Sequence, residues 1–207
     1  MKKLLYILLF IPLALFGQEL YNIPDANFLS YLQEEHSEII VNDSLDVITA
    51  SGVISINCNY REIVSLDGLQ FFTSLTTLIC YSNQLTVLPD LPEGLTNFNC
   101  ASNQLTSLPE LPDGITALHC ENNQLTSLPD LPEGLTYFIC RGNELTTLPN
   151  LPEGLTTFVC SFNQLTSLPE LPEGLIELYC ENNQLTSLPY LPSSITWLNI
   201  QGNDSIT

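Results

Sequence analysis

The chain has 207 residues, of which 23 are Asp or Glu and only 4 are Lys or Arg, so its formal net charge at pH 7 is −19. A surface this acidic excludes unaided binding to nucleic acid or to anionic membranes, because like charges repel. The length is sufficient for one domain that buries a continuous core.

The N-terminus predicts export. Met1 is followed by two lysines, an apolar run over residues 4–16 and then Gly17. This order is typical of a secretory signal peptide, and the apolar run is short for a membrane span. We therefore expect a signal peptide over residues 1–17 and an exported bacterial protein, located outside the cell or at its surface. No transmembrane segment is expected after cleavage, and no lipoprotein anchor, because the first cysteine is Cys58.

Residues 18–52 carry no repeat and predict an N-terminal cap. Within 23–32, Pro and Asp stand in the first turn, and Phe28 and Leu32 fall on one apolar face. This pattern is typical of a short amphipathic helix. Solenoid ends expose apolar edges, so we expect the helix to cover the first coil. The acidic segment 42–46 is interpreted as a turn.

From residue 53 to 207 the chain is a repeat with a period of 20, seen most clearly in the unit from Leu131 to Asn150. Such a period predicts a solenoid of stacked coils. Each coil is expected to contain a short strand, centred at Ile139 in this unit, and an extended return limb, because two prolines exclude a helix there. Gly154 is expected to permit the bend into the next strand. The first repeat is degenerate and the last incomplete, so we expect the natural sequence to continue.

Two columns of the repeat point inward. Asparagines recur at the end of each strand, as at Asn143, and their amides are expected to pair backbone groups of neighbouring coils. Cysteines recur every 20 residues from Cys80 to Cys180. Their parallel Cβ vectors do not favour a disulfide, and no pair has zinc-site spacing, so we expect buried free thiols that act as small apolar side chains.

The motif N-Q-L-T-S-L-P-x-L-P-x-G-L-T resembles the short, 20-residue leucine-rich repeats of exported or secreted bacterial proteins, and the resemblance extends from Leu66 to the C-terminus. It implies a leucine-rich-repeat solenoid, a parallel β-sheet horseshoe that binds partners mainly on its concave face. The function of such proteins varies too widely to be carried over.

The sequence does not predict an enzyme. His119 and Cys120 are neighbours in a strand, so they face opposite sides and cannot form a nucleophile and base pair. His119 and Glu121 share a face, but no nucleophile, metal ligand set or closed pocket accompanies them. Cofactors are therefore not expected, apart from the calcium alternative below.

The concave face is instead predicted to bind a protein or peptide, or a glycan, because aromatic anchors beside charges are typical of interfaces. Arg141 is one of two basic residues left once the signal is removed. The simpler alternative is that Arg141 and Glu121 only form an exposed cross-strand pair. The candidate partner-binding residues are His119, Glu121, Tyr137, Ile139, Arg141, Val159, Phe162, Glu177, Tyr179, Glu181 and Trp197.

The acidic residues suggest a second function. Carboxylates at one position of successive coils would lie about 5 Å apart, where a divalent cation could bridge them. The protein would then be a structural surface scaffold or spacer stiffened by Ca²⁺. The residues of this candidate metal column are Glu93, Asp113, Glu133, Glu153 and Glu173.

Overall fold

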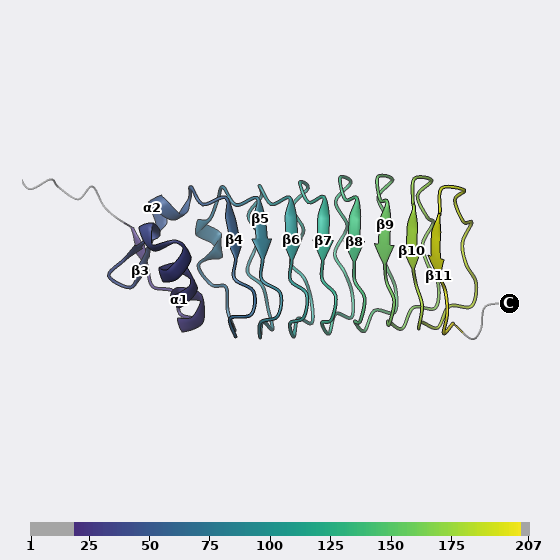
Figure 1. The fold of residues 1–207 in the computed structure, drawn as a ribbon, viewed down its shortest axis with the longest axis horizontal. Helices are drawn as coiled ribbons and strands as arrows, with labels where there is room; N and C mark the ends of the chain where they lie inside the picture. The colour runs from purple at the N-terminus through teal and green to yellow at the C-terminus, as the bar shows by residue number, and fades with distance from the viewer. Residues whose placement is uncertain (1–18, 204–207) are drawn as a thin grey trace, which may run out of the picture.

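The computed structural model describes residues 19–203, and the predicted signal peptide lies outside them. An N-terminal unit of helices and short strands lies at one end, and a solenoid of stacked coils continues from it (Figure 1). The elements of the N-terminal unit are β1 (Leu20–Tyr21), α1 (Ala26–Glu35), the 3-10 helix η1 (Ser37–Ile39), β2 (Ile40–Val41), β3 (Ser44–Asp46) and α2 (Val47–Ala50).

One aspartate makes several of the contacts between the N-terminal unit and the first coil. Oδ1 of Asp25 caps α1 by accepting the amides of Asn27 and Phe28 at 2.9 and 2.8 Å. Oδ2 of the same side chain accepts the amides of Val64 and Ser65 at 2.8 and 3.0 Å. The predicted short helix is thus present, and its N-cap also satisfies backbone groups of the first repeat.

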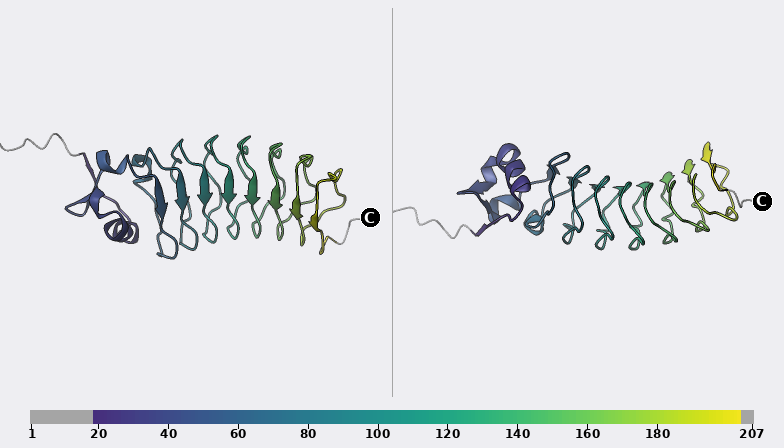
Figure 2. Two further views of the ribbon diagram at one scale, coloured as in Figure 1. Left: turned by 45° about the horizontal axis from the view of Figure 1, so that its top comes forward. Right: turned by 90° about the horizontal axis from the view of Figure 1, so that it is seen from below.

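Each coil of the solenoid contributes one strand to a single parallel sheet in chain order, from β4 to β11. These strands are β4 (Ser55–Asn57), β5 (Thr77–Ile79), β6 (Asn97–Asn99), β7 (Ala117–His119), β8 (Tyr137–Ile139), β9 (Thr157–Val159), β10 (Glu177–Tyr179) and β11 (Trp197–Asn199), and η2 (Leu69–Phe71) precedes β5. The strand face is gently hollowed (Figure 2). The strand lies one residue earlier than expected, because Ile139 is the last residue of β8 and not its centre.

The core is a set of columns that run along the solenoid. The middle residue of each strand from β4 to β10 is fully buried, as Phe138 is in β8, and its ring stacks on Phe158 of the next coil at a centroid distance of 5.5 Å. All seven cysteines are buried and free, which confirms the predicted column of thiols. Since the buried side chains of each coil are covered by those of the coils on both sides, the coils stabilise one another by burial.

The asparagine column satisfies the backbone at the turn after each strand. Oδ1 of Asn143 accepts the amide of Leu125 at 3.0 Å, and Nδ2 donates to the carbonyls of Cys120 and Cys140 at 3.1 and 3.0 Å. The same three bonds recur at the asparagines of neighbouring coils. Each side chain therefore links two coils through groups that would otherwise be buried without partners.

The glycine of the return limb lies in the turn before the next strand, as predicted, but the turn does not need a left-handed backbone there. Gly154 does not adopt a positive φ. At Gly114 a Cβ would lie 3.1 Å from the carbonyl oxygen of Leu95 in the preceding coil. In the last coil Ser194 stands at this position and donates its hydroxyl to the carbonyl of Leu175 at 2.6 Å. The close approach is limited to the earlier coils, since a Cβ at Gly154 would lie 3.9 Å from its nearest neighbours.

The return limbs between residues 87 and 92, and at the same place in later coils, contain neither helix nor strand. Every helix in the described part of the chain is too short or too polar to cross a membrane.

Candidate functional site: the concave strand face

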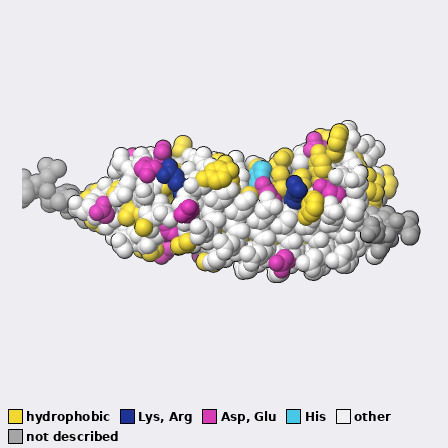
Figure 3. Space-filling view, turned by 60° about the horizontal axis from the view of Figure 1, so that its bottom comes forward, with side chains coloured by type: hydrophobic (Ala, Val, Ile, Leu, Met, Phe, Trp, Pro, Cys, Tyr) yellow, Lys and Arg dark blue, Asp and Glu magenta, His cyan; other side chains and the backbone are white. Residues whose placement is uncertain are grey.

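The concave face carries a shallow pocket near its C-terminal end, with a volume of about 390 Å³. Towards that end of the molecule, basic, acidic and hydrophobic side chains gather along the upper part of Figure 3. The pocket spans β8 to β11, and its lining residues are Tyr137, Arg141, Thr157, Val159, Ser161, Glu177, Tyr179, Glu181 and Asn199.

The pocket brings together only part of the predicted set. Six of the eleven candidates line it, and three further lining residues were not predicted: Thr157, Ser161 and Asn199. Ser161 is fully buried, and its Oγ contacts the carbonyl of Tyr179 at 3.4 Å. The sequence did contain a signal for Ser161, because the equivalent residues of the neighbouring coils, Arg141 and Glu181, are both larger. The candidates outside the lining are His119, Glu121, Ile139, Phe162 and Trp197.

Arg141 does not pair with Glu121, so the simpler sequence interpretation of these two residues is wrong. No ion pair between Arg141 and a carboxylate is present within residues 19–203. The guanidinium instead lies over the ring of Phe162, 4.7 Å from its centroid. This stacking orients the guanidinium plane and leaves its N–H donors free for another acceptor.

Phe162 departs from the repeat in a way that the sequence analysis missed. Its φ is 55°, in the left-handed region, and 45% of its side chain is exposed. Most other coils place small or amide residues at this left-handed position, but the first coil has an exposed aromatic residue there too, Tyr60, with a φ of 57°. The small or amide residues are Ser82, Ser102, Asn122, Gly142, Asn182 and Gly202. An aromatic side chain is disfavoured in that conformation. The exposed ring of Phe162 is nevertheless available for contact with a ligand beside Arg141.

Two carboxylates of the same face are incompletely satisfied. Oε2 of Glu121 and Oε2 of Glu181 are buried and have no hydrogen-bond partner. The other oxygen of Glu121 lies 3.8 Å from Nδ1 of His119, whose ring lies 5.2 Å from that of Tyr137. A buried carboxylate oxygen without a donor is unfavourable, so neither carboxylate is explained by the packing of the coils.

Electrostatics at the site favour cations and give no nucleophile. Burial, followed by the charges of Glu177 and Glu181, raises the pKa of Tyr179. Burial also raises the pKa of every cysteine thiol, to about 12 for Cys58 and for Cys180. The thiols therefore remain protonated at neutral pH, and none of them is activated for covalent chemistry.

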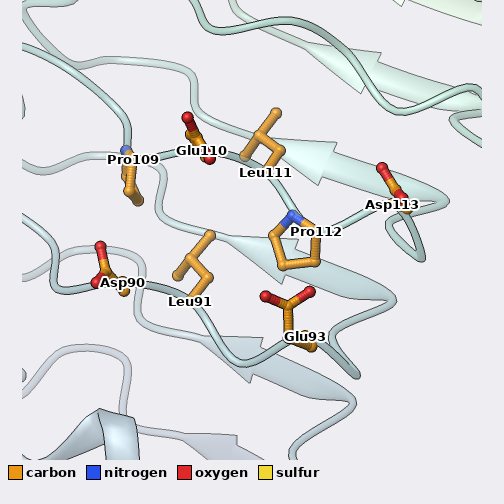
Figure 4. Close-up of a pocket in the computed structure, with 8 residues that line it drawn as sticks. All are labelled: Asp90, Leu91, Glu93, Pro109, Glu110, Leu111, Pro112 and Asp113. Carbon is orange, nitrogen blue, oxygen red and sulfur yellow. The ribbon is translucent and has the colours of Figure 1, made fainter.

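The return limbs form a second set of grooves, each between two coils. One of about 480 Å³ is lined by Leu91, Leu111 and Pro112, with the carboxylates of Glu93 and Asp113 nearby (Figure 4). The carboxylates are spread around the groove rather than directed at one point. Across residues 19–203, no group of three or more His, Cys, Asp or Glu side chains is placed to hold a metal ion.

Comparison with solved structures identifies the fold. YopM from Yersinia enterocolitica superposes with a TM-score of 0.64 at 33% identity, over 72% of this chain and 38% of that chain. The functional domain of InlJ from Listeria monocytogenes superposes with a TM-score of 0.66 at 31% identity, over 86% of this chain and 45% of that chain. The fold is a bacterial leucine-rich-repeat solenoid. A Shigella effector domain gives a TM-score of 0.62 at 27% identity, over 82% of this chain and 78% of that one.

The leucine-rich-repeat solenoid spans less than half of the YopM and InlJ chains that it matches. The InlJ domain is described as including a cysteine ladder, a feature that this solenoid also has in its seven buried thiols. No protein-family model and no curated protein matches the chain.

Proposed function

We propose that this protein is an exported module that binds a protein or peptide through the concave face of its sheet, without catalysis. The observation that carries the proposal is the pocket around Arg141, where a cation without a carboxylate partner stacks on a strained, exposed Phe162. No carboxylate within residues 19–203 pairs with the guanidinium, and the ring of Phe162 is exposed. Both present groups that a partner can use, and aromatic and Arg side chains dominate the energetics of protein interfaces.

The resemblance to bacterial proteins supports the same conclusion. Leucine-rich-repeat solenoids present an extended surface whose outward residues are free of packing demands. The YopM of Yersinia pestis is described as an effector, and it superposes with a TM-score of 0.61 at 33% identity, over 76% of this chain and 49% of that chain. Export of the present chain is inferred from its predicted signal peptide, and capping of the first coil by α1 is inferred from the contacts of Asp25.

The proposal is tested by selecting displayed random peptides on the full chain and on a variant with Tyr137, Arg141 and Tyr179 all replaced by alanine. We expect enriched peptides that bind the wild type and lose at least tenfold in affinity for the variant. A matched control replaces Glu133, Glu153 and Glu173 by alanine, in the turns before the strands and outside the pocket, and it should retain binding. Enrichment of no peptide, or of peptides that bind both proteins equally, would rule out recognition by the concave face.

A further inference from the structure

The residues at the ends of the strands carry a charge order that suggests the chemistry of the ligand. We call this the strand-end column, and its members are Tyr81, Ala101, Glu121, Arg141, Ser161, Glu181 and Gln201. Neighbouring members of the column lie side by side in adjacent coils, as backbone hydrogen bonds show. The amide of Gly142 donates to the carbonyl of Ser161 at 2.9 Å, and the amide of Phe162 donates to the carbonyl of Glu181 at 2.9 Å. The column therefore runs along the solenoid axis.

Three charged members of this column, Glu121, Arg141 and Glu181, are incompletely paired. Oε2 of Glu121 and of Glu181 is buried without a hydrogen bond, and no carboxylate pairs with Arg141 within residues 19–203. Adjacent coils are one strand spacing apart, so the backbone positions of Arg141 and Glu121 are separated by about 5 Å. Glu181 is three coils from Glu121, which gives a separation of about 14 Å. Ser161 stands between Arg141 and Glu181. The order along the axis is thus acceptor, donor, gap, acceptor.

An extended peptide matches this order. Its side chains alternate, so residues i, i+2 and i+4 face the same side at spacings of about 7 Å, and five residues span about 13 Å. A basic side chain at i can reach Glu121, an acidic one at i+2 can reach Arg141, and a basic one at i+4 can reach Glu181. Complementary charges of this kind fix register and select partners.

The second basic side chain would enter the pocket of about 390 Å³. There Glu177 and Glu181 supply negative charge, and the rings of Tyr137 and Tyr179 supply faces that attract a cation. A Lys or Arg head group would pair with the negative charge of the Glu181 carboxylate, which lines the pocket. The acidity of the whole chain, with 23 acidic against 4 basic residues, would steer such a ligand towards the protein.

From this arrangement we propose that the concave face binds an extended peptide segment with the pattern basic-x-acidic-x-basic, laid along the solenoid axis over Glu121, Arg141 and Glu181. The inference rests on the proposed function, because it names the partner chemistry of the same face. The inference adds a register to the proposed function, and a general preference for positive charge would have no register.

The test uses a labelled peptide, acetyl-Gly-Lys-Ser-Asp-Ser-Lys-Gly-amide, and a permuted peptide with the core Asp-Ser-Lys-Ser-Lys, which has the same composition and charge. Binding to the full chain is followed by fluorescence anisotropy. We expect the first peptide to bind at least tenfold tighter. Glu121→Gln and Glu181→Gln should each weaken it at least fivefold, whereas Glu133→Gln, an exposed carboxylate outside the face, should leave it unchanged.

Equal binding of the two peptides would overturn the proposed register, as would indifference of binding to Glu181→Gln. The selection of displayed peptides separates this failure from failure of the proposed function. Enriched peptides that depend on Tyr137 and Arg141 but lack the charge pattern would contradict only the present inference. Absence of any peptide that depends on the face would contradict both.

Discussion

Two columns that lie only two residues apart in each coil behave in opposite ways. In the asparagine column every copy from Asn83 to Asn203 is buried, and each copy bonds to backbone groups. In the strand-end column the residue changes from coil to coil, and two carboxylates keep an oxygen without a partner. The contrast separates the side chains that hold coils together from those available to a ligand, which is the distinction that the following predictions test.

The largest effect on stability should come from raising the pH, because the buried thiols belong to the columns that hold the coils together. Burial raises the pKa of all seven, whereas in the unfolded chain they ionise near about 8.5. Above that pH the unfolded state binds fewer protons, so stability falls by about 1.4 kcal/mol per pH unit for each thiol. Urea unfolding between pH 7 and 10 should show a steep loss, and a flat profile would show that the thiols ionise in the folded state.

Next in size is the loss of one asparagine. Asn143→Leu removes the acceptor for the amide of Leu125 and the donor to the carbonyls of Cys120 and Cys140, which stay buried. We expect a loss on the order of 3–5 kcal/mol in the free energy of unfolding. Arg141→Gln, two residues away, should change that free energy by less than about 0.5 kcal/mol. Equal losses for the two variants would erase the distinction between the columns.

A smaller effect, of opposite sign, is expected at Phe162. Phe162→Asn installs a residue type that two other coils already use at this left-handed position. Relief of the backbone conformation should stabilise the protein by about 1 kcal/mol, less the exposed cation–π contact with Arg141. Peptide binding should weaken in the same variant. Thermal unfolding and anisotropy measure the two effects, and a less stable variant would show that Phe162 serves the fold.

The smallest expected effect concerns calcium, which the alternative of a stiffened scaffold requires. A cation that binds only the folded state raises its Tm. The carboxylates beside Leu91 and Leu111 are spread around their groove, so we expect Tm to be the same in Ca²⁺ and in EDTA (Figure 4). A clear rise of Tm with Ca²⁺ would show that the acidic column, which runs from Glu93 to Glu173, has a structural role.

Much of the fold could be predicted because a period of 20 repeats the same physical demand in every coil. The column of asparagines, the buried free cysteines and the single parallel sheet all follow from it. The close approach of the Leu95 carbonyl to Gly114 could not be predicted, because it depends on how coils stack. The exact strand limits likewise depend on hydrogen bonds that periodicity does not specify.

The candidate site was only partly predictable, because a sequence places residues on a face without fixing their contacts. Alternation placed Tyr137 and Tyr179 on the concave face, and both line the pocket there. It also made Glu121 the neighbour of Arg141, yet the guanidinium turns to Phe162 in the opposite direction along the chain. That choice depends on the left-handed φ of Phe162, which places its ring beside Arg141 and which no pattern of apolar residues reveals.

The central claim, that the strand-end column serves a ligand rather than the fold, is tested most directly by the double variant Glu121→Gln, Glu181→Gln. Its free energy of unfolding and its affinity for the Lys-Ser-Asp-Ser-Lys peptide would be measured side by side. A neutral amide is less unfavourable to bury than a carboxylate without a donor, so we predict stability that is unchanged or higher, together with at least tenfold weaker binding. Lower stability with unchanged binding would contradict the account.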